Sequence, residues 1–191
     1  FVVKIPFDLD IHNLIDDLKN FSWEASETLL YYANSLKNAE EHKNIIKTKN
    51  KEAPVTLADL KVNELIIQRI NDKYKDIGWG ILTEENVKFS PNVNHSEEQK
   101  EWTWVLDPLD GTKDFIQGTG NYAMHLALNF KNRPFIGVVL IPERDELWIS
   151  DEKKVWCEKS DGSQQKIHMP RDKNLEQMTL VSSKNHRNEI L

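Results

Sequence analysis

The stretch from Trp104 to Phe115 constrains this chain most, because an apolar run leads directly into two carboxylates, a proline and a glycine. The apolar run predicts a buried strand, and Pro108 and Gly111 predict the tight turn that ends it. Asp107 and Asp110 are then held close together on a rigid bend. Two carboxylates forced together repel, and a divalent cation relieves that repulsion. The stretch therefore predicts a metal site, with an acid-rich surface turn as the simpler alternative.

Composition excludes several classes of protein. The 191 residues leave room for one domain or one and a half. A net charge of -6 argues against general binding of nucleic acid through its phosphates. The mean hydropathy is -0.61, and no apolar run is long enough to span a bilayer. The single cysteine, Cys157, fits a reducing compartment, so we expect a cytoplasmic protein without a membrane span.

Two segments have helical periodicity. Apolar residues recur three or four positions apart between Ile11 and Leu36, which predicts a long amphipathic helix capped by Asp10. A second periodic segment follows Thr56. Thr56 and Asp59 match a capping box, which is a sufficient structural explanation of both residues.

The rest of the chain predicts strands joined by short turns. Residues 77–83 form an apolar strand that ends in Glu84 and Glu85, and residues 116–121 form a glycine-rich loop. His125 lies within an apolar strand, so we expect a buried core histidine. Short turns between consecutive strands indicate an antiparallel meander. The expected fold class is α+β, with helices layered on a mainly antiparallel sheet whose later strands are 122–130, 135–142, 146–150, 155–158 and 178–183.

The hexapeptide from Asp107 to Thr112 resembles the signature of the inositol monophosphatase superfamily of magnesium-dependent phosphatases. The extension through Lys113, Asp114 and Phe115 is most similar to the 3'(2'),5'-bisphosphate nucleotidases of the CysQ type. Two upstream motifs agree: Thr-x-x-Asp ending at Asp59, and the paired glutamates. The resemblance implies the N-terminal domain of the inositol monophosphatase-like fold.

The resemblance also implies roles for individual residues. Asp59 and Thr112 would form the catalytic pair that orients the attacking water. Glu85 would be an outer-sphere group or a ligand of a third Mg²⁺ ion. The implied ligands of two Mg²⁺ ions are Glu84, Asp107, the Leu109 carbonyl and Asp110, and the implied substrate-binding residues are Gly111, Thr112, Ser183 and His186.

The implied activity is removal of the 3'-phosphate from 3'-phosphoadenosine 5'-phosphate, or from its phosphosulfate, a reaction of sulfur metabolism. One alternative is an inositol or sugar monophosphatase, and another is a non-catalytic metal-binding or assembly module. Lys51 and Ala53 stand where the family often has Asp and Ser, so we assign no metal ligand to that loop.

The family's further metal-ligand Asp, within a Trp-Asp-x-Ala-Ala-Gly segment, has no counterpart in this sequence. We therefore expect a fragment or a shortened product. Its domains would be a metal-binding domain over residues 1–180 and the start of a C-terminal domain over residues 181–191. An uncovered sheet face would then take a partner, either a second copy in a homodimer or the remainder of the chain.

Overall fold

The computed structural model describes most of the chain between residues 5 and 165. The described residues are 5–6, 9–38, 44–47, 55–89, 100–151, 153–165, 167, 174, 176 and 178, with the backbone alone at 87–89. The helices are α1 (Ile11–Ser35), α3 (Leu57–Tyr74), α4 (Glu84–Phe89) and α5 (Thr112–Gln117), and the 3-10 turns are η2 (Lys75–Ile77) and η3 (Pro142–Arg144). The strands are β1 (Gly80–Thr83), β2 (Trp102–Asp110), β3 (Ala123–Phe130), β4 (Arg133–Ile141), β5 (Glu146–Ser150), β6 (Val155–Glu158) and β7 (Gln164–Gln165).

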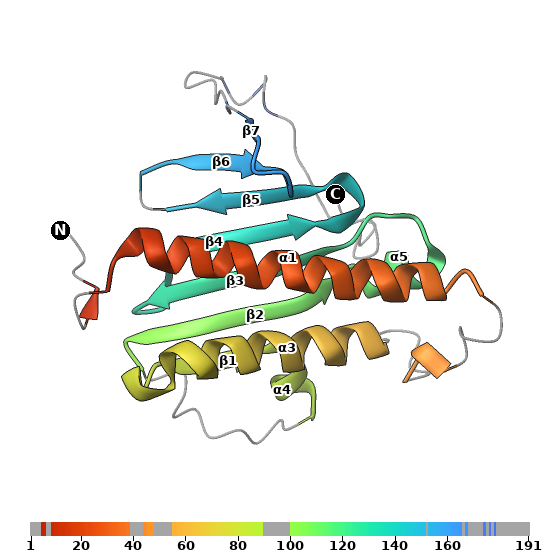
Figure 1. Ribbon diagram of the computed structural model, residues 1–191, viewed down its shortest axis with the longest axis horizontal. Coiled ribbons are helices and arrows are strands. Elements are labelled where there is room, and N and C mark those ends of the chain that lie inside the picture. Colours follow the sequence, from red (N-terminus) through yellow and green to blue (C-terminus); the bar gives the residue numbers. More distant parts are fainter. Residues whose placement is uncertain are drawn as a thin grey trace.

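The strands form one sheet in sequence order. β1 pairs with β2 in parallel, and every later pair is antiparallel. α1 and α3 lie side by side on one face of this sheet, as Figure 1 shows. The expected α+β class, helices on a mainly antiparallel sheet, is therefore confirmed. No helix in the described part of the chain combines the length and apolar character needed to cross a membrane.

The core lies between the two long helices and the sheet. Alternate residues of the strands point toward the helices, among them Trp104, Leu126 and Leu140, each fully or almost fully buried. From the helices, Leu18 and Ile66 are buried against them. Burial of one such side chain favours folding by roughly 1.5–3 kcal/mol, so this layer is the main source of stability for the strands that carry the site.

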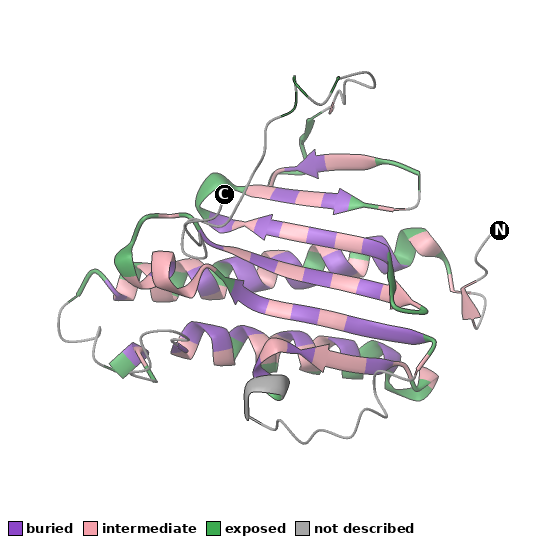
Figure 2. Ribbon diagram, turned by 180° about the vertical axis from the view of Figure 1, so that it is seen from behind, coloured by how far each residue is buried: buried purple, intermediate pink, exposed green. Residues whose placement is uncertain are grey.

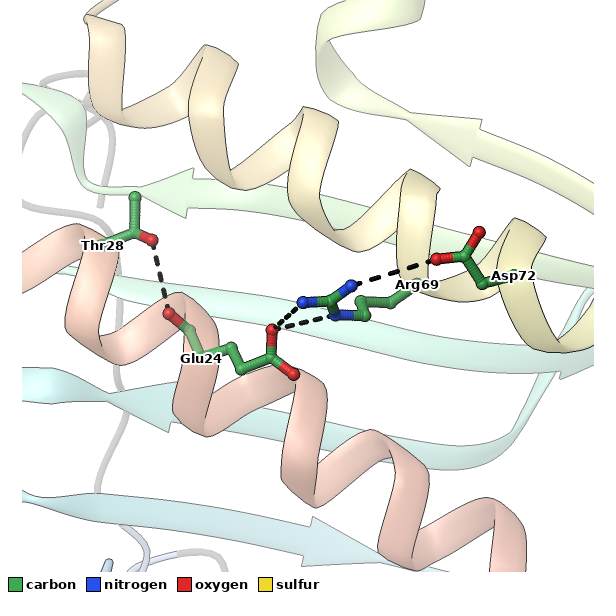
Figure 3. Close-up of polar contacts among 4 residues, drawn as sticks. All are labelled: Glu24, Thr28, Arg69 and Asp72. Atoms are coloured by element: carbon green, nitrogen blue, oxygen red, sulfur yellow. Dashed lines mark hydrogen bonds and ion pairs between the residues drawn. The ribbon is translucent and has the colours of Figure 1, made fainter.

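Polar contacts between α1 and α3 lie outside this core. The Arg69 guanidinium donates two hydrogen bonds to Glu24 Oε2, at 2.9 Å from Nε and 2.6 Å from Nη2 (Figure 3). Arg69 also lies 3.9 Å from Asp72. The Glu24 and Arg69 side chains are 41% and 36% exposed, so solvent screens the ion pair and it contributes little to stability. The packing of α1 beside α3 therefore depends mainly on the buried apolar side chains.

The opposite face of the sheet is hollowed. In the view from behind, residues of intermediate exposure alternate with buried ones along the central strands (Figure 2). A hollow of about 750 Å³ lies over this face. Its floor includes Val105, Ala127, Val139 and Trp148, and Asp107 lies at its edge. The face is therefore apolar over its middle and acidic at one end.

The local predictions for the helices are confirmed. Asp10 caps α1, accepting a hydrogen bond from the His12 amide at 2.8 Å, and Thr56 forms a capping box with Asp59. One expectation is wrong. Residues 116 and 117 belong to α5, because Gly118, with φ of 68°, ends that helix later than the loop expectation placed its end. The expected strand at 178–183 lies outside the described residues, apart from residue 178.

One buried ion pair joins α1 to the edge of the sheet. Lys19 Nζ lies 2.8 Å from Glu158 Oε1, and the Glu158 side chain is only 5% exposed. Glu158 also accepts a hydrogen bond from the Gln164 amide at 3.1 Å. The hydrogen bond with the Glu158 carboxylate raises the pKa of Lys19 above its usual value. Removal of the cation would leave a buried carboxylate without its charged partner, which is costly.

We therefore expect Lys19→Met to lower the free energy of unfolding by roughly 2 to 3 kcal/mol, measured by urea denaturation. Lys61→Met is the matched control, because the Lys61–Glu64 pair is exposed; it should leave the free energy of unfolding almost unchanged. Equal losses in the two variants would show that the Lys19–Glu158 pair is energetically unimportant.

Candidate active site

The parallel pairing of β1 with β2 brings two acids of distant sequence together. Thr83, the last residue of β1, lies opposite Leu106 of β2. Both strands run in the same direction, so Glu84 and Asp107 follow at the same end of the sheet. Glu84 shares a hydrogen bond with Asp107. The motif of paired glutamates and the aspartate signature are therefore parts of one site.

A bulge in β2 directs the signature acids. The β2–β3 register shifts between Asp107 and Asp110, where Pro108 cannot donate a ladder hydrogen bond. Asp107 Oδ1 accepts a hydrogen bond from the Leu109 amide at 3.2 Å, which holds the carboxylate over its own turn. The Leu109 side chain is buried, and the Asp110 side chain is exposed. The bend expected from the sequence is thus an irregular strand end.

Gly111 cannot be replaced without strain. Its φ is 85°, and a Cβ atom at this position would lie 2.8 Å from the Asn121 carbonyl oxygen. This close approach requires glycine. The chain then turns directly into α5, so Thr112 begins that helix beside the acids.

A hydrogen-bond network connects the start of α3 to the start of α5. Asp59 is fully buried, and its Oδ2 accepts bonds from the amide and the hydroxyl of Thr56, at 2.8 and 2.6 Å. Thr112 Oγ1 lies 3.3 Å from Asp59 Oδ1 and 3.1 Å from the Leu109 carbonyl oxygen, and can donate its one proton to either. The structure therefore places Asp59 in contact with Thr112, and uses separate carboxylate oxygens for the cap and for that contact.

Asp107 is an acid of this site whose pKa is raised. Burial, the Glu84 carboxylate and the Asp110 carboxylate together raise the pKa of Asp107 to about 7. The hydrogen bond from the Leu109 amide acts in the opposite direction but is weaker. The acids thus form a site of high negative potential, where a cation would be favoured.

His125 is the residue that the sequence analysis missed. It was expected in the core, but its side chain is 44% exposed and its Nε2 lies 3.9 Å from Asp110 Oδ2. It faces Asp107 directly across the β2–β3 ladder and lines the hollow. The alternation of the strand was the available signal, because His125 has the opposite parity to the buried Met124 and Leu126.

The donor set suits a hard cation. Glu84, Asp107, Asp110 and the Leu109 carbonyl offer only oxygen, the ligand type that Mg²⁺ prefers. Among the residues that the structure describes, no three His, Cys, Asp or Glu side chains converge into a metal-binding cluster. The fit to Mg²⁺ therefore rests on the chemistry of the donors and on their mutual repulsion. Glu85, 2% exposed on α4, is buried beside them.

Seven of the ten residues with predicted roles lie around the end of β2, on β2 itself or on the starts of α4 and α5: Glu84, Glu85, Asp107, Leu109, Asp110, Gly111 and Thr112. Asp59 joins them through Thr112. The predicted substrate contacts at Ser183 and His186 lie outside the described residues, as do Lys51 and Ala53.

Comparison with protein families gives a match over nearly the whole chain. Residues 11–190 match the model of the inositol monophosphatase family. The 3'(2'),5'-bisphosphate nucleotidase CysQ of Salmonella typhimurium is 32% identical over 110 residues, which cover 58% of this chain and 42% of that protein. The CysQ protein of Buchnera aphidicola is 28% identical over 194 residues, covering 98% of this chain and 67% of its own length. The matches therefore span only part of the length of these relatives.

The fold also matches solved structures. The extragenic suppressor protein suhB of Bartonella henselae superimposes with a TM-score of 0.62 at 21% identity, over 78% of this chain and 52% of that one. At this identity the match concerns the fold alone. The solved structure supports the arrangement of the long helices on the sheet.

The raised pKa of Asp107 predicts how stability depends on pH in the metal-free protein. Between pH 3.8, the ordinary value, and about 7, the folded state holds a proton on Asp107 that the unfolded state has lost. Asp107 therefore lowers stability increasingly as the pH rises through this range. Since the side chain is partly exposed, we expect Asp107→Asn to stabilise the protein by about 1 to 2 kcal/mol above pH 7 and by almost nothing near pH 4.

Urea denaturation in EDTA from pH 4 to 8 measures this difference. Asp76→Asn is the control, because Asp76 is exposed on η2, at the opposite end of β1 from the acids, and should give a flat difference. A wild-type protein more stable than Asp107→Asn at pH 7.5 would contradict the electrostatic account.

Proposed function

Since the chain belongs to the inositol monophosphatase family, we propose that its acids and its Asp59–Thr112 pair serve a Mg²⁺-dependent phosphomonoesterase. The proposed reaction removes the 3'-phosphate of 3'-phosphoadenosine 5'-phosphate or of its phosphosulfate. Water is the nucleophile, and the products are inorganic phosphate and the ribose 3'-hydroxyl.

One observation carries the proposal: the Thr112 hydroxyl, which adjoins the acids, contacts the buried Asp59 carboxylate at 3.3 Å. An acid-rich turn on a protein surface requires no such partner. A hydroxyl held between a carboxylate and a carbonyl can donate its only proton to these groups. Its lone pairs then remain available to accept a hydrogen bond from a water molecule.

Glu84, Asp107, Asp110 and the Leu109 carbonyl would hold the Mg²⁺ ions, and Glu85 would be an outer-sphere group or a ligand of a third ion. When bound, divalent cations stabilise negative charge on the phosphate oxygens and lower the pKa of a coordinated water. The positive charge of a bound cation would offset the burial and the repulsion that raise the pKa of Asp107, so metal binding would be coupled to loss of the Asp107 proton.

Thr112 and Asp59 would position the attacking water. The water would donate a hydrogen bond to Thr112 Oγ1, and Asp59 Oδ1 would accept a hydrogen bond from the Thr112 hydroxyl. Because Thr56 occupies the other carboxylate oxygen, Asp59 cannot turn away from Thr112 without breaking the cap of α3. Such positioning is the main contribution of a protein to phosphoryl transfer.

The substrate contacts are proposed from the sequence pattern. Gly111 and Thr112 directly follow the acids, so we assign them to the scissile phosphate. Ser183 and His186 would border the nucleotide. The nucleotide is favoured over inositol phosphate by Lys113 and Asp114 and by the CysQ names of the relatives. Asp114 accepts a hydrogen bond from Thr119 at 2.8 Å, so it also holds the glycine-rich loop in place.

We expect Mg²⁺-dependent phosphate release from 3'-phosphoadenosine 5'-phosphate to exceed release from inositol 1-phosphate. Asp110→Asn should reduce kcat by at least about 100-fold, since it removes a metal ligand. Asp76→Asn is the control and should keep full activity. If the wild-type chain binds Mg²⁺ but hydrolyses neither substrate, the non-catalytic metal-binding module becomes the better account.

Thr112→Val tests the proposed orientation of water separately from metal binding. We expect kcat to fall about 100-fold while the affinity for Mg²⁺ stays within about twofold, because Val keeps the shape of Thr but cannot accept from water. Thr28→Val on α1 is the matched control, since its hydroxyl bonds only the Glu24 carbonyl of its own helix. An unchanged kcat in Thr112→Val would assign Asp59 to capping alone.

A further inference from the structure

The turn η3 brings a cation to the acidic end of the sheet. β4 runs antiparallel to β3, so it ends beside the start of β3 and near the bulge of β2. Arg144, in η3, lines a pocket of about 220 Å³ together with Asp110, Asn121 and Tyr122. Asp110 thus lines this pocket, whereas Asp107 lines the hollow over the sheet.

One side of this turn is anchored to the loop that follows α5. The Tyr122 side chain is 4% exposed, and its hydroxyl donates a hydrogen bond to Glu143 Oε1 at 3.1 Å. Gly120 packs close to the same side chain, since a Cβ atom there would lie 3.5 Å from Glu143 Cγ. Glu143 is therefore committed to holding η3 against the loop.

The other side of the turn is anchored to the segment after β6. Lys159 Nζ donates to the Arg144 carbonyl oxygen at 2.9 Å, and the Ser160 amide donates to Asp145 Oδ1 at 3.2 Å. Asp145 adopts φ of 53° and closes the turn through a bond to the Pro142 carbonyl at 3.0 Å. The backbone of Arg144 is thus held from both sides.

The Arg144 guanidinium is left available by this arrangement. The residue is exposed, and within the described part of the chain its side chain makes no hydrogen bond or ion pair. The two acids beside it in the turn, Glu143 and Asp145, already accept bonds from other groups. A guanidinium that is carried on a firmly held backbone and lines an open pocket is suited to bidentate binding of a phosphate.

We infer that Arg144 determines specificity by binding a second phosphate of the substrate, distinct from the one that is hydrolysed. The inference rests on the proposed function, because it takes the scissile phosphate to lie at Asp110 and the other acids. A substrate phosphorylated twice would reach both groups at once. A monophosphate, whose remaining groups are hydroxyls, forms only a weaker neutral contact with the guanidinium.

Two nucleotides with the same scissile ester test this inference: adenosine 3',5'-bisphosphate and adenosine 3'-monophosphate. The wild-type chain should prefer the bisphosphate in kcat/KM. Arg144→Ala should reduce this preference about tenfold, chiefly through KM for the bisphosphate. Arg144→Lys should recover part of it, since lysine keeps the charge but loses the fork. Arg133→Ala, at the opposite end of β4, is the control and should keep the wild-type preference.

An unchanged preference in Arg144→Ala would overturn the inference. An equal fall in kcat for both nucleotides would also overturn it, because it would assign Arg144 to the charge balance of the acids. A wild-type chain that hydrolyses neither nucleotide would refute the proposed function instead. In that case titration calorimetry in Mg²⁺ measures the affinity of the chain for each nucleotide. A tenfold higher affinity for the bisphosphate that is lost in Arg144→Ala supports the inference, and equal wild-type affinities for the two nucleotides refute it.

Discussion

Parallel pairing of β1 with β2 is the constraint on which the site depends. Because the two strands are parallel and Thr83 lies opposite Leu106, Glu84, directly after β1, and Asp107, the next residue along β2, come together toward one end of the sheet. The helix layer keeps this pair in place, because Trp104 and Leu106 are buried beneath α1 and α3 next to the acids. A shift of one residue in register would turn Asp107 into the core.

The same strand pairing brings carboxylates together at the acidic end of the sheet, where their charges oppose folding. Asp107 is held near two other carboxylates, and burial together with their repulsion raises its pKa to about 7. The rest of the fold offsets it: the apolar layer is large, and the buried Glu158 has Lys19 as its partner. A cation bound beside Glu84, Asp107 and Asp110 would supply positive charge at this end of the sheet, which would link affinity for the metal to stability.

Local chemistry accounts for what the sequence predicts well. The Thr56–Asp59 capping box and the helices involve residues a few positions apart, and the turn at Gly111 follows from its proline and glycine. His125 and Arg144 were not predicted as site residues, because their positions depend on distant contacts. His125 faces Asp107 through strand register, and the turn that carries Arg144 is held by bonds that join residues 15 and 21 positions apart.

Asp59 shows how one buried carboxylate serves both the fold and the proposed reaction. Its Oδ2 accepts two bonds from Thr56, which secure the first turn of α3, and its Oδ1 remains for Thr112. The two functions are therefore separable, since loss of the Thr112 hydroxyl leaves the cap intact. The cap also restricts Asp59 to one orientation, so the stability of α3 and the positioning of Thr112 have a common origin. The capping motif alone therefore does not reveal the role proposed for Asp59; the contact of Asp59 Oδ1 with Thr112 does.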